Sequence, residues 1–546
     1  MTLGVADRQA NLFDDVERFC DKVLDERSIY AFMHRERDRL FPDEEFADLF
    51  DIHGRRSVPP SVVATVMVLQ RLEGLSDREA VDRYCFDNRW RYATGVGGYD
   101  TGGWTSFAHT VLVDMRERLR RSERPDRIFD AALFAAKQAG VVGNRRALDS
   151  TPLYDAVATM DTVTLIRSAI RALLKLANRK LRAELGAVLT SGDDYASSSK
   201  PQIDWEDAQA REALIDSRAK DAFSCLGLLD GRKLDPAVTE AAKLLATVTG
   251  QDLVEGDDGV FRIARKVAKD RVISTVDPEA RHGHKTNARS FDGFKGHVAI
   301  DPDSEIITAT VVTPGNAGDA SVATELIADL LVDEDGDGED TSGRDNAKEP
   351  PATDDAPVPE NKDGASTIYG DNAYGTGAFQ ERLEEANIDS RCKTQQPTAA
   401  GGLFTKDCFT IDLGARTVTC PAEVTVEIRR HGMAYFGEAC VDCPLRIKCT
   451  TATAGRTIGI SPHEQALARA RKRQTEQAWR DDYRATRPKV ERKLAHLVYR
   501  RHGGRRARVR GADKVGADFR LLAGAANLAR LARLGLGWSA EGWAIA

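Results

Sequence analysis

Apolar residues recur at helical spacing along the first 140 residues of the chain. The runs LFDDVERFCDKVL and PPSVVATVMVLQRLEG place them three or four positions apart, which predicts helices with an apolar face. Ser76 and Glu79 form a capping-box pair, so another helix is expected to begin near Ser76. We therefore predict a helical N-terminal domain. Short helices in succession suit a DNA-binding helix-turn-helix module, although many other helical domains share this pattern.

The period of the pattern changes after this helical part. A short apolar run ends at Asp149 and predicts a buried strand. Between residues 294 and 300 apolar and polar side chains alternate, as in a half-buried strand, and a second strand follows a tight turn at residues 301–304. A further buried strand over residues 367–371 ends at a second carboxylate, Asp371. We expect these strands to form one core that insertions interrupt.

The segments between the strands differ in composition. A long stretch returns to helical spacing, an Asp-, Glu- and Gly-rich stretch has almost nothing to bury and predicts a disordered loop, and a late stretch rich in Thr, Val and Cys suggests small strands. In chain order we predict the helical N-terminal domain (1–140), the first part of the core (141–159), a helical insertion (160–270), core strands and a helix (271–331), the acidic loop (332–363), more core (364–391), a cysteine-rich β insertion (392–461), and a core helix with a basic C-terminal region (462–546).

The composition of the chain indicates a soluble protein with several domains. The chain has 546 residues, of which 42% are hydrophobic, so several domains with real cores are expected. No apolar run approaches the roughly 20 residues that span a bilayer, and the N-terminus is too acidic for a secretory signal. These features predict a soluble cytoplasmic protein. The acidic loop also fails as a calcium-binding EF-hand, because Arg344 stands where a bidentate Glu is needed.

Positive charge is concentrated late in the chain. The net charge of −7 does not itself indicate nucleic acid, but residues 491–520 contain ten Lys or Arg residues, and DNA binding follows local basic surface. Lys285 lies in a basic stretch before the alternating strand, where an ordinary polar loop is an equal reading. The predicted DNA-contacting residues of the late stretch are Arg500, Arg501, Arg505, Arg506, Arg508 and Arg510.

Three carboxylates occupy positions that suit a two-metal centre. Asp149 and Asp371 follow short buried strands, and Glu491 lies beside the apolar stripe of a late helix. Strand ends that are neighbours in a sheet can supply two ligands, and a helix packed over that edge supplies the third. Asp155 and Asp161 are rivals for the first position, but both follow the strand in a helix-leaning stretch. For Asp371 the alternative role is a cap on the following helix.

The sequence resembles the DDE transposases of bacterial insertion sequences, in the branch with an N-terminal helical transposase domain and a C-terminal signature of the Tyr-Arg-Glu type. The phrases that carry the resemblance are ALDSTPL, DPEARHGHKTNARSFDGFKGHVAID, TPGNAGD, IYGDNAYGTG and YRATRPKVERKLAHLVYRRHGGRRARVRG. They occur in the family's order, and the resemblance covers roughly residues 10–535, except for the acidic loop. The resemblance implies a multidomain α/β protein with an RNase H-like catalytic core, and nucleoid-associated cleavage and joining of DNA.

Matched by position, the resemblance makes Asp149, Asp371 and Glu491 the catalytic residues and the ligands of Mg²⁺ or Mn²⁺. Arg484 and Arg487 match the arginine positions of the signature and are predicted to contact DNA. The sequence departs from the family pattern at Val498, where a lysine is usual. Pro488 is read as a helix start or a kink, which leaves the face of Arg484 open. The implied partners are the terminal inverted repeats of the element and target DNA, bound by a homodimer.

Four cysteines form a second constellation. Cys420 precedes the pair Cys440 and Cys443, and Cys449 follows, so four thiolates could hold a structural Zn²⁺. The alternative is a set of reduced, buried thiols, with Cys392 and Cys408 as spare candidates. His282 and His284 are a weaker metal-binding pair.

Two other functions fit the same residues. One is a different RNase H-like DNA nuclease, such as a resolvase, which would share the carboxylates but not the recognition of element ends. The other is a decayed transposase that still binds DNA without cutting it. Cleavage that is specific to inverted repeats would separate transposition from both.

Overall fold

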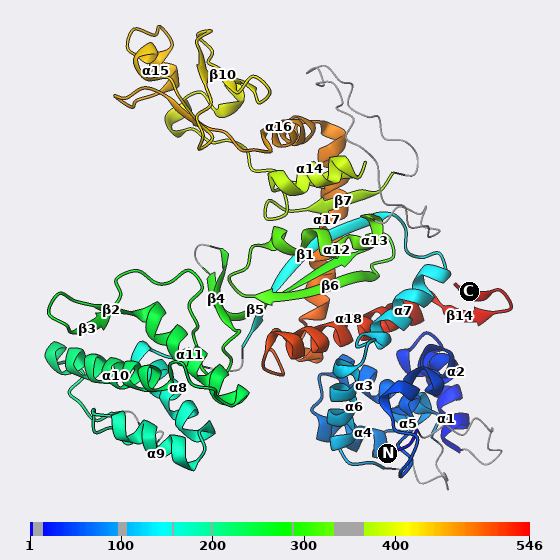
Figure 1. Ribbon diagram of the computed structural model, residues 1–546. Helices are drawn as coiled ribbons and strands as arrows, with labels where there is room; N and C mark the ends of the chain where they lie inside the picture. The colour runs from blue at the N-terminus through cyan, green and yellow to red at the C-terminus, as the bar shows by residue number, and fades with distance from the viewer. Residues whose placement is uncertain are drawn as a thin grey trace, which may run out of the picture.

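A mixed sheet of six strands lies at the centre of the molecule (Figure 1). The computed structural model describes residues 1–3, 15–96, 106–155, 158–197, 199, 201–286, 289–331 and 365–545, so the predicted acidic loop (332–363) lies outside the described residues. The strands of the sheet are β1 (Arg145–Tyr154), β4 (Arg281–Thr286), β5 (Arg289–Ile300), β6 (Ile307–Pro314), β7 (Thr367–Gly370) and β8 (Asp389–Cys392). Neighbours run in the order β6-β5-β1-β7-β8, and β4 pairs with the first part of β5. β5 is antiparallel to β1 and β6, whereas β7 is parallel to β1 and β8.

Helices cover both faces of this sheet. α17 (Gln477–Leu497) and α18 (Ala512–Leu534) pack on one face, where Val298 and Leu494 share a buried core. On the opposite face Ala299 packs with Leu383 of α14 (Gly377–Glu385) and with α12 (Ala323–Leu326), which α13 (Ala328–Leu331) follows. The strand predicted to be half-buried over residues 294–300 is therefore covered on both sides.

α17 runs through Pro488 without a break in its assignment. The sequence predicted a helix start or a kink there, because proline cannot donate the hydrogen bond to the preceding turn. Val490, Leu494 and Leu497 on the next turns are buried against the sheet, and their packing outweighs the missing bond. The helix therefore presents the turns before and after Pro488 to the same region of the sheet.

The N-terminal part is helical, as predicted. Its helices are α1 (Asp15–Val23), α2 (Ile29–Leu40), α3 (Pro60–Glu73), α4 (Asp77–Phe86), α5 (Asn88–Thr94), α6 (Thr110–Arg121) and α7 (Arg127–Gln138). The capping box of Ser76 and Glu79 is confirmed at the start of α4. Nearly every residue of α3 is buried, because α18 from the other end of the chain packs against both α3 and α7.

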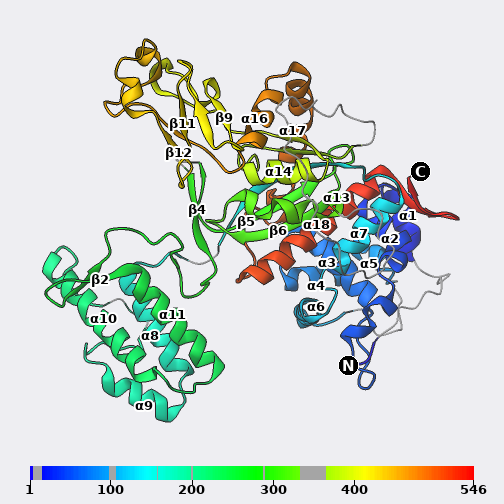
Figure 2. The same ribbon diagram turned by 45° about the horizontal axis from the view of Figure 1, so that its top comes forward.

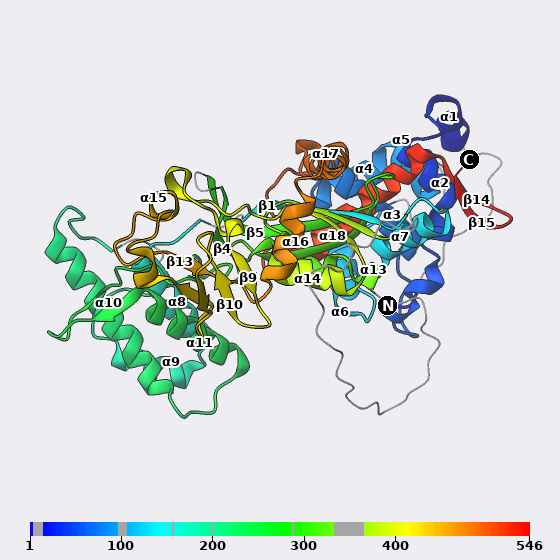
Figure 3. The same cartoon turned by 90° about the horizontal axis from the view of Figure 1, so that it is seen from above.

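Two insertions extend from the same end of the sheet, opposite the N-terminal helices (Figure 3). The first consists of α8 (Thr162–Leu176), α9 (Arg179–Val188), α10 (Ala208–Leu229), α11 (Pro236–Asp252) and the hairpin β2 (Leu253–Glu255) and β3 (Phe261–Ile263). It has an apolar core of its own, and Figure 2 shows it set apart from the sheet.

The second insertion is built of small strands around the cysteines. It contains β9 (Thr410–Asp412), β10 (Thr417–Thr419), β11 (Thr425–Glu427), β12 (Met433–Tyr435), the short helix α15 (Arg446–Cys449) and β13 (Thr457–Gly459). Its core is separate from that of the sheet. α16 (Glu464–Arg473) leads back from it to α17.

The chain ends in a long helix and a hairpin. α18 begins at Ala512, and β14 (Leu536–Ser539) pairs with β15 (Gly542–Ile545) after it. Between α17 and α18 lies a basic loop, residues 499–511, with one 3₁₀ turn at Arg500–His502. No helix in the described part of the chain is long and apolar enough to cross a membrane.

Candidate active site

Two of the predicted carboxylates come from neighbouring strands. Asp149 lies within β1, opposite Val298 of β5, and Asp371 is the first residue after β7. β1 and β7 run parallel with Ala147 beside Tyr369, so the same register continued by two residues brings Asp149 beside Asp371. The sequence placed the end of the first strand at Asp149, but β1 continues to Tyr154. Asp149 is therefore held by strand pairing at the place where β7 stops.

A single guanidinium joins these aspartates to Glu491. Arg487 Nη2 lies 3.0 Å from Asp149 Oδ1 and 3.8 Å from Asp371 Oδ2, and Arg487 Nε lies 3.8 Å from Glu491 Oε1. Arg487 Nη1 also donates to the carbonyl oxygen of Leu148 at 3.1 Å. Glu491 is one helical turn after Arg487 on α17, so both side chains leave the helix on the face toward β1 and β7. The three predicted carboxylates thus surround one cation.

Exposure increases from the floor of this group to its rim. The side chains of Arg487 and Asp149 are 8% and 15% exposed, whereas those of Asp371 and Glu491 are 45% and 61% exposed. Burial raises the pKa of the Asp149 carboxyl, and the neighbouring guanidinium offsets only part of that rise. Burial by itself lowers the pKa of Arg487, but the adjacent Asp149 outweighs it and the pKa is raised overall. The guanidinium therefore stays charged.

The donor chemistry of this group fits a hard divalent cation, because all three side chains offer carboxylate oxygens. In the described part of the chain no three His, Cys, Asp or Glu side chains converge closely enough to hold a metal as they stand. The position between these carboxylates is taken by the guanidinium of Arg487. The oxygens could converge on a metal only after that guanidinium withdraws.

The competing acidic residues have structural partners. Asp161 caps α8 by accepting from the backbone N–H of Thr164, and Asp301 accepts from the N–H groups of residues 303 and 304 in the predicted tight turn. Asp371 does not cap α14, whose N-cap residue is Thr376. The Asp371 side chain instead accepts the N–H of Ala373 inside its own turn.

A partly buried polar network behind β1 was not predicted. The Ser150 hydroxyl donates to Asp319 at 2.6 Å, and Lys295 Nζ donates to the same carboxylate at 2.8 Å. These residues lie on the opposite face of the sheet from Arg487, next to Asp149 along the strand. The available signal was Lys295 itself, a charged residue in a strand that is buried on both faces.

Tyr374 and His297 extend this network toward Asp371. The Tyr374 hydroxyl lies 3.3 Å from His297 Nδ1, and His297 Nε2 lies 2.9 Å from the Thr313 hydroxyl. Burial lowers the pKa of His297 to about 4, so the imidazole is neutral at neutral pH. Tyr374 is buried three residues after Asp371, and its pKa is raised first by burial and then by Asp319, Asp149 and Asp371. The tyrosine therefore lies within electrostatic reach of both aspartates.

The predicted DNA-binding arginines divide into two groups. Arg487 is buried among the carboxylates, whereas Arg484 is 71% exposed and pairs only with Asp481, so the two do not share a partner. Val498 is the C-cap residue of α17. Lys285 is exposed on β4.

The basic loop is fixed between the N-terminal helices and β1. Tyr154 N–H donates to the carbonyl of Arg505, and Ala507 N–H donates to that of Tyr154. The loop therefore pairs alongside the end of β1, the strand that carries Asp149. At its other end the His502 carbonyl accepts from Arg71 of α3 at 2.5 Å. Within the described residues, none of the six arginines of the loop has a carboxylate within 4.0 Å: Arg500, Arg501, Arg505, Arg506, Arg508 and Arg510.

The four predicted zinc ligands gather in the second insertion. Cys420, Cys440, Cys443 and Cys449 line one small cavity, and all nine cysteines are free thiols. Burial raises the pKa of Cys449, as do the other three thiols of the group. Of the spare candidates, Cys392 is buried in β8 and Cys408 is exposed elsewhere. His282 pairs with Asp292 at 2.7 Å and does not join a ligand group.

Two family models match the chain. A model described as a transposase DDE domain matches residues 419–532, which include α17, with Arg487 and Glu491, and the basic loop. A transposase domain (DUF772) matches residues 18–118, from α1 through most of α6. No curated protein and no solved structure matches the chain. The two matches fall on two parts of the chain that pack together through α18, and both support an insertion-sequence DDE transposase.

Proposed function

We propose that this transposase cuts DNA at the ends of its element and joins those ends to target DNA, with Asp149, Asp371 and Glu491 as the catalytic carboxylates. The observation that carries the proposal is Arg487, whose guanidinium lies within 4.0 Å of all three. Acidic side chains from two strands and from a helix gather around this guanidinium. Metals of phosphoryl transfer likewise require carboxylates that converge from separate elements. The coarser conclusion, a transposase, does not depend on this assignment.

The core is RNase H-like under this proposal. Three antiparallel strands, β6-β5-β1, are followed by two parallel ones, β7-β8, and the two aspartates lie on the adjacent strands β1 and β7. Glu491 lies on α17, which packs across β1 and β7. This topology and the placement of the acids at one edge support the proposal.

Asp149, Asp371 and Glu491 would hold Mg²⁺ or Mn²⁺, which prefer carboxylate oxygens. When bound, such ions supply positive charge to the attacking and leaving oxygens of a phosphodiester. Asp149 contributes a carboxylate whose position is set by strand pairing, and Glu491 contributes one at the exposed rim, where DNA arrives. Arg487, once displaced from the carboxylates, can donate to a phosphate oxygen.

Two reactions follow in this mechanism. Water attacks phosphorus at the element end, the bond to the 3′ oxygen breaks, and that oxygen leaves as a hydroxyl. The 3′-hydroxyl then attacks a target phosphodiester, forms the new strand and releases the target's own 3′-hydroxyl. Neither reaction needs a covalent bond to the protein, so no Ser or Tyr nucleophile is assigned.

We propose that the basic loop carries double-stranded DNA past this site. The loop pairs with Tyr154 at the end of β1, and its arginines have no carboxylate partner within the described residues. It therefore places positive charge beside the strand that carries Asp149. The partners are the terminal inverted repeats and the target duplex, and a homodimer would hold two ends together. Arg484, exposed on α17, and Lys285, on β4, are candidates for further phosphate contacts.

We also propose a structural Zn²⁺ on Cys420, Cys440, Cys443 and Cys449. The support is that these thiols line one cavity of a small domain with few other buried residues. Purified protein is expected to contain one zinc per chain, and Cys443→Ser should lose it, whereas the exposed Cys408→Ser should keep it. Metal analysis that finds no zinc in the intact protein would contradict this assignment.

The test of catalysis uses linear DNA that carries the inverted repeats flanking the gene. Asp149→Asn, Asp371→Asn and Glu491→Gln are each expected to reduce cleavage by about 10³-fold or more while end binding persists. Asp481→Asn is the matched control, because Asp481 lies on the same helix and its partners, Gln477 and the exposed Arg484, are outside the carboxylate group. Full cleavage by any of the three variants removes that residue from the site.

Two other results would change the function itself. Cleavage that ignores the inverted repeats but prefers branched DNA would indicate a resolvase-like nuclease. Binding of the repeats by the wild-type protein without cleavage in Mg²⁺ or Mn²⁺ would indicate a catalytically decayed transposase.

A further inference from the structure

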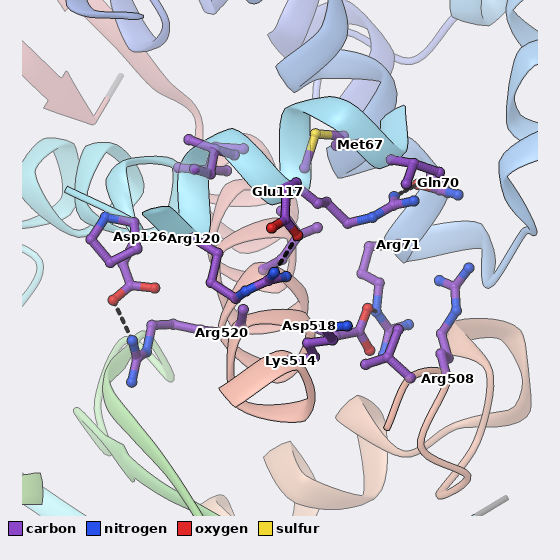
Figure 4. A pocket seen from close by; sticks show the side chains of 18 of the residues that line it. Met67, Gln70, Arg71, Glu117, Arg120, Asp126, Arg508, Lys514, Asp518 and Arg520 are labelled. Carbon is purple, nitrogen blue, oxygen red and sulfur yellow. Dashed lines mark hydrogen bonds and ion pairs between the residues drawn. The ribbon is translucent and has the colours of Figure 1, made fainter. Parts of the chain in front are cut away.

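A cavity of about 540 Å³ lies between the N-terminal helices and the C-terminal part of the chain (Figure 4). Its walls come from α3, the starts of α4 and α7, α6, the basic loop and α18. These walls belong to the two segments that the transposase models match, residues 18–118 and 419–532, together with the linker and helix between them. The cavity is distinct from the carboxylate group, which it does not include.

All four carboxylates in the wall already have a cationic partner. Asp77 accepts two hydrogen bonds from Arg116, and Asp518 accepts one from Arg71 at 3.0 Å. Glu117 pairs with Arg120, and Asp126 pairs with Arg520, as the dashed lines in Figure 4 show. The acidic residues therefore leave no net negative charge in the wall.

Two cations of the wall remain uncompensated. Arg508 and Lys514 have no carboxylate within 4.0 Å in the described part of the chain. One N–H of Arg508 donates a hydrogen bond to the carbonyl oxygen of Leu75. Burial lowers the pKa of Arg508 and the nearby Arg71 and Arg116 lower it further, while the attraction of Asp518 and Asp77 offsets only part of this effect. In Figure 4 Arg508 lies next to Arg71 at one end of the cavity. An anion bound there would relieve the repulsion among these arginines.

Apart from Gln70 and Ser76, the rest of the wall is apolar, and the space is large. Leu119, Ile128 and Phe129 are buried side chains of the wall, and Val113 contributes a partly exposed one. A bare phosphate would fill only a small part of the cavity, whose volume lies in the range of sites for whole small molecules. A ligand that uses both features carries a phosphate and a flat or apolar body.

We propose that this cavity binds a nucleotide, with its phosphate on Arg508 and Lys514 and its base against the apolar wall. The nucleotide can be a free one or an unpaired nucleotide of a DNA strand held by the basic loop. Only the second source rests on the proposed function. In either case the bound phosphate ties the N-terminal helices to the basic loop.

Isothermal titration of the full-length protein with deoxyadenosine 5′-monophosphate tests the site. We expect binding that Arg508→Ala weakens by at least about tenfold, the loss for one charge-assisted phosphate contact. Val113→Trp, at a side chain that is 46% exposed, should block the cavity without removing a charge. Arg179→Ala, at an exposed arginine of the helical insertion far from the cavity wall, is the control and should bind like the wild type.

Three results would overturn the proposal: no binding of the nucleotide at millimolar concentration, equal binding of inorganic phosphate and nucleotide, or equal losses in the Arg508 and Arg179 variants. Competition with duplexes that have blunt or single-nucleotide overhanging ends separates the sources. Displacement by the overhang alone identifies a DNA nucleotide, and displacement by neither identifies a free one. The carboxylate variants that test cleavage leave this cavity intact, so the two proposals fail independently.

Discussion

Arg487 is the residue on which the geometry of the carboxylates depends. Its replacement by glutamine leaves the largely buried Asp149 without its ion pair and lets three acidic side chains repel one another. We expect the unfolding free energy of metal-free protein to fall by about 3 kcal/mol. Added Mn²⁺ should stabilise Arg487→Gln more than the wild type, because no guanidinium has to be displaced.

Chemical denaturation with and without Mn²⁺ measures both effects. Arg484→Gln is the control, since its exposed pair with Asp481 is worth less than about 1 kcal/mol and touches no carboxylate of the site. If Mn²⁺ stabilised Arg487→Gln less than the wild type, Arg487 would be helping to hold the metal rather than occupying its place.

His297 gives the molecule a predictable sensitivity to acid. Its pKa in the folded state is about 4, against an ordinary value of 6.5, so the unfolded chain binds the extra proton first as the pH falls. The neutral His297 therefore contributes to the unfolding free energy in full above pH 6.5. This contribution, roughly 3 kcal/mol in total, is lost as the pH falls from 6.5 to 4.

Replacement of His297 by glutamine, which keeps a polar group between Tyr374 and Thr313, should flatten this part of the stability profile. The comparison is made by urea denaturation at closely spaced pH values. An unchanged slope between pH 6.5 and 4 in the variant would assign the acid sensitivity to another group.

At the scale of elements, the sequence located the strands better than it located their ends. The run Ser150-Thr151-Pro152 suggested that the first strand stops at Asp149, yet β1 continues to Tyr154. Proline is tolerated there because β7 pairs with β1 only as far as Ala147, so Pro152 lies where the strand has β5 on one side only. The prediction failed because that missing neighbour depends on where β7 ends, far along the chain.

The contact between α3 and the basic loop can be tested at Gly74. This residue ends α3 with a φ of +67°, and a Cβ there would lie 2.6 Å from the carbonyl oxygen of Arg501. Gly231 has the same φ of +67° but nothing within 4 Å of such a Cβ. Both alanine variants lose about 1 kcal/mol for the backbone conformation, and Gly74→Ala should lose a further 1–3 kcal/mol for the clash.

Thermal unfolding of the two variants isolates the contact, because the cost of φ cancels in their difference. Gly74→Ala should also weaken the binding of inverted-repeat DNA, since the loop that carries the arginines is displaced. Equal stability of the two variants would mean that the loop moves aside without loss, and that α3 does not hold it.

At the scale of the whole molecule, the sequence indicated the parts but not how they join. The three carboxylates, the late helix and the cysteine group could be identified from short motifs and spacing. The packing of α18 on α3, and the bond from Arg71 to the carbonyl of His502, join positions more than four hundred residues apart, and no local pattern encodes such a contact. The burial of Lys295 and His297 could not be predicted for the same reason, because it depends on helices from later in the chain.

The uneven charge of the whole chain leads to a last prediction. The net charge is −7, yet the basic loop has exposed arginines without acidic partners, so DNA binding should be strongly salt-dependent and local to that loop. Replacing Arg505, Arg506 and Arg510 together by alanine removes up to three phosphate contacts. The slope of log binding constant against log salt should become shallower by roughly 0.9 per contact, nearly 3 in all.

The matched control removes the same charge elsewhere. Lys175, Arg179 and Lys180 are exposed on α8 and α9 of the helical insertion, and their triple alanine variant changes the net charge of the chain equally. Fluorescence anisotropy with an inverted-repeat duplex at several salt concentrations compares the two. Only DNA that runs along the basic loop makes the position of the lost charges matter. If both variants shifted the slope alike, the overall charge of the chain would attract the DNA, or the DNA would contact the insertion as well.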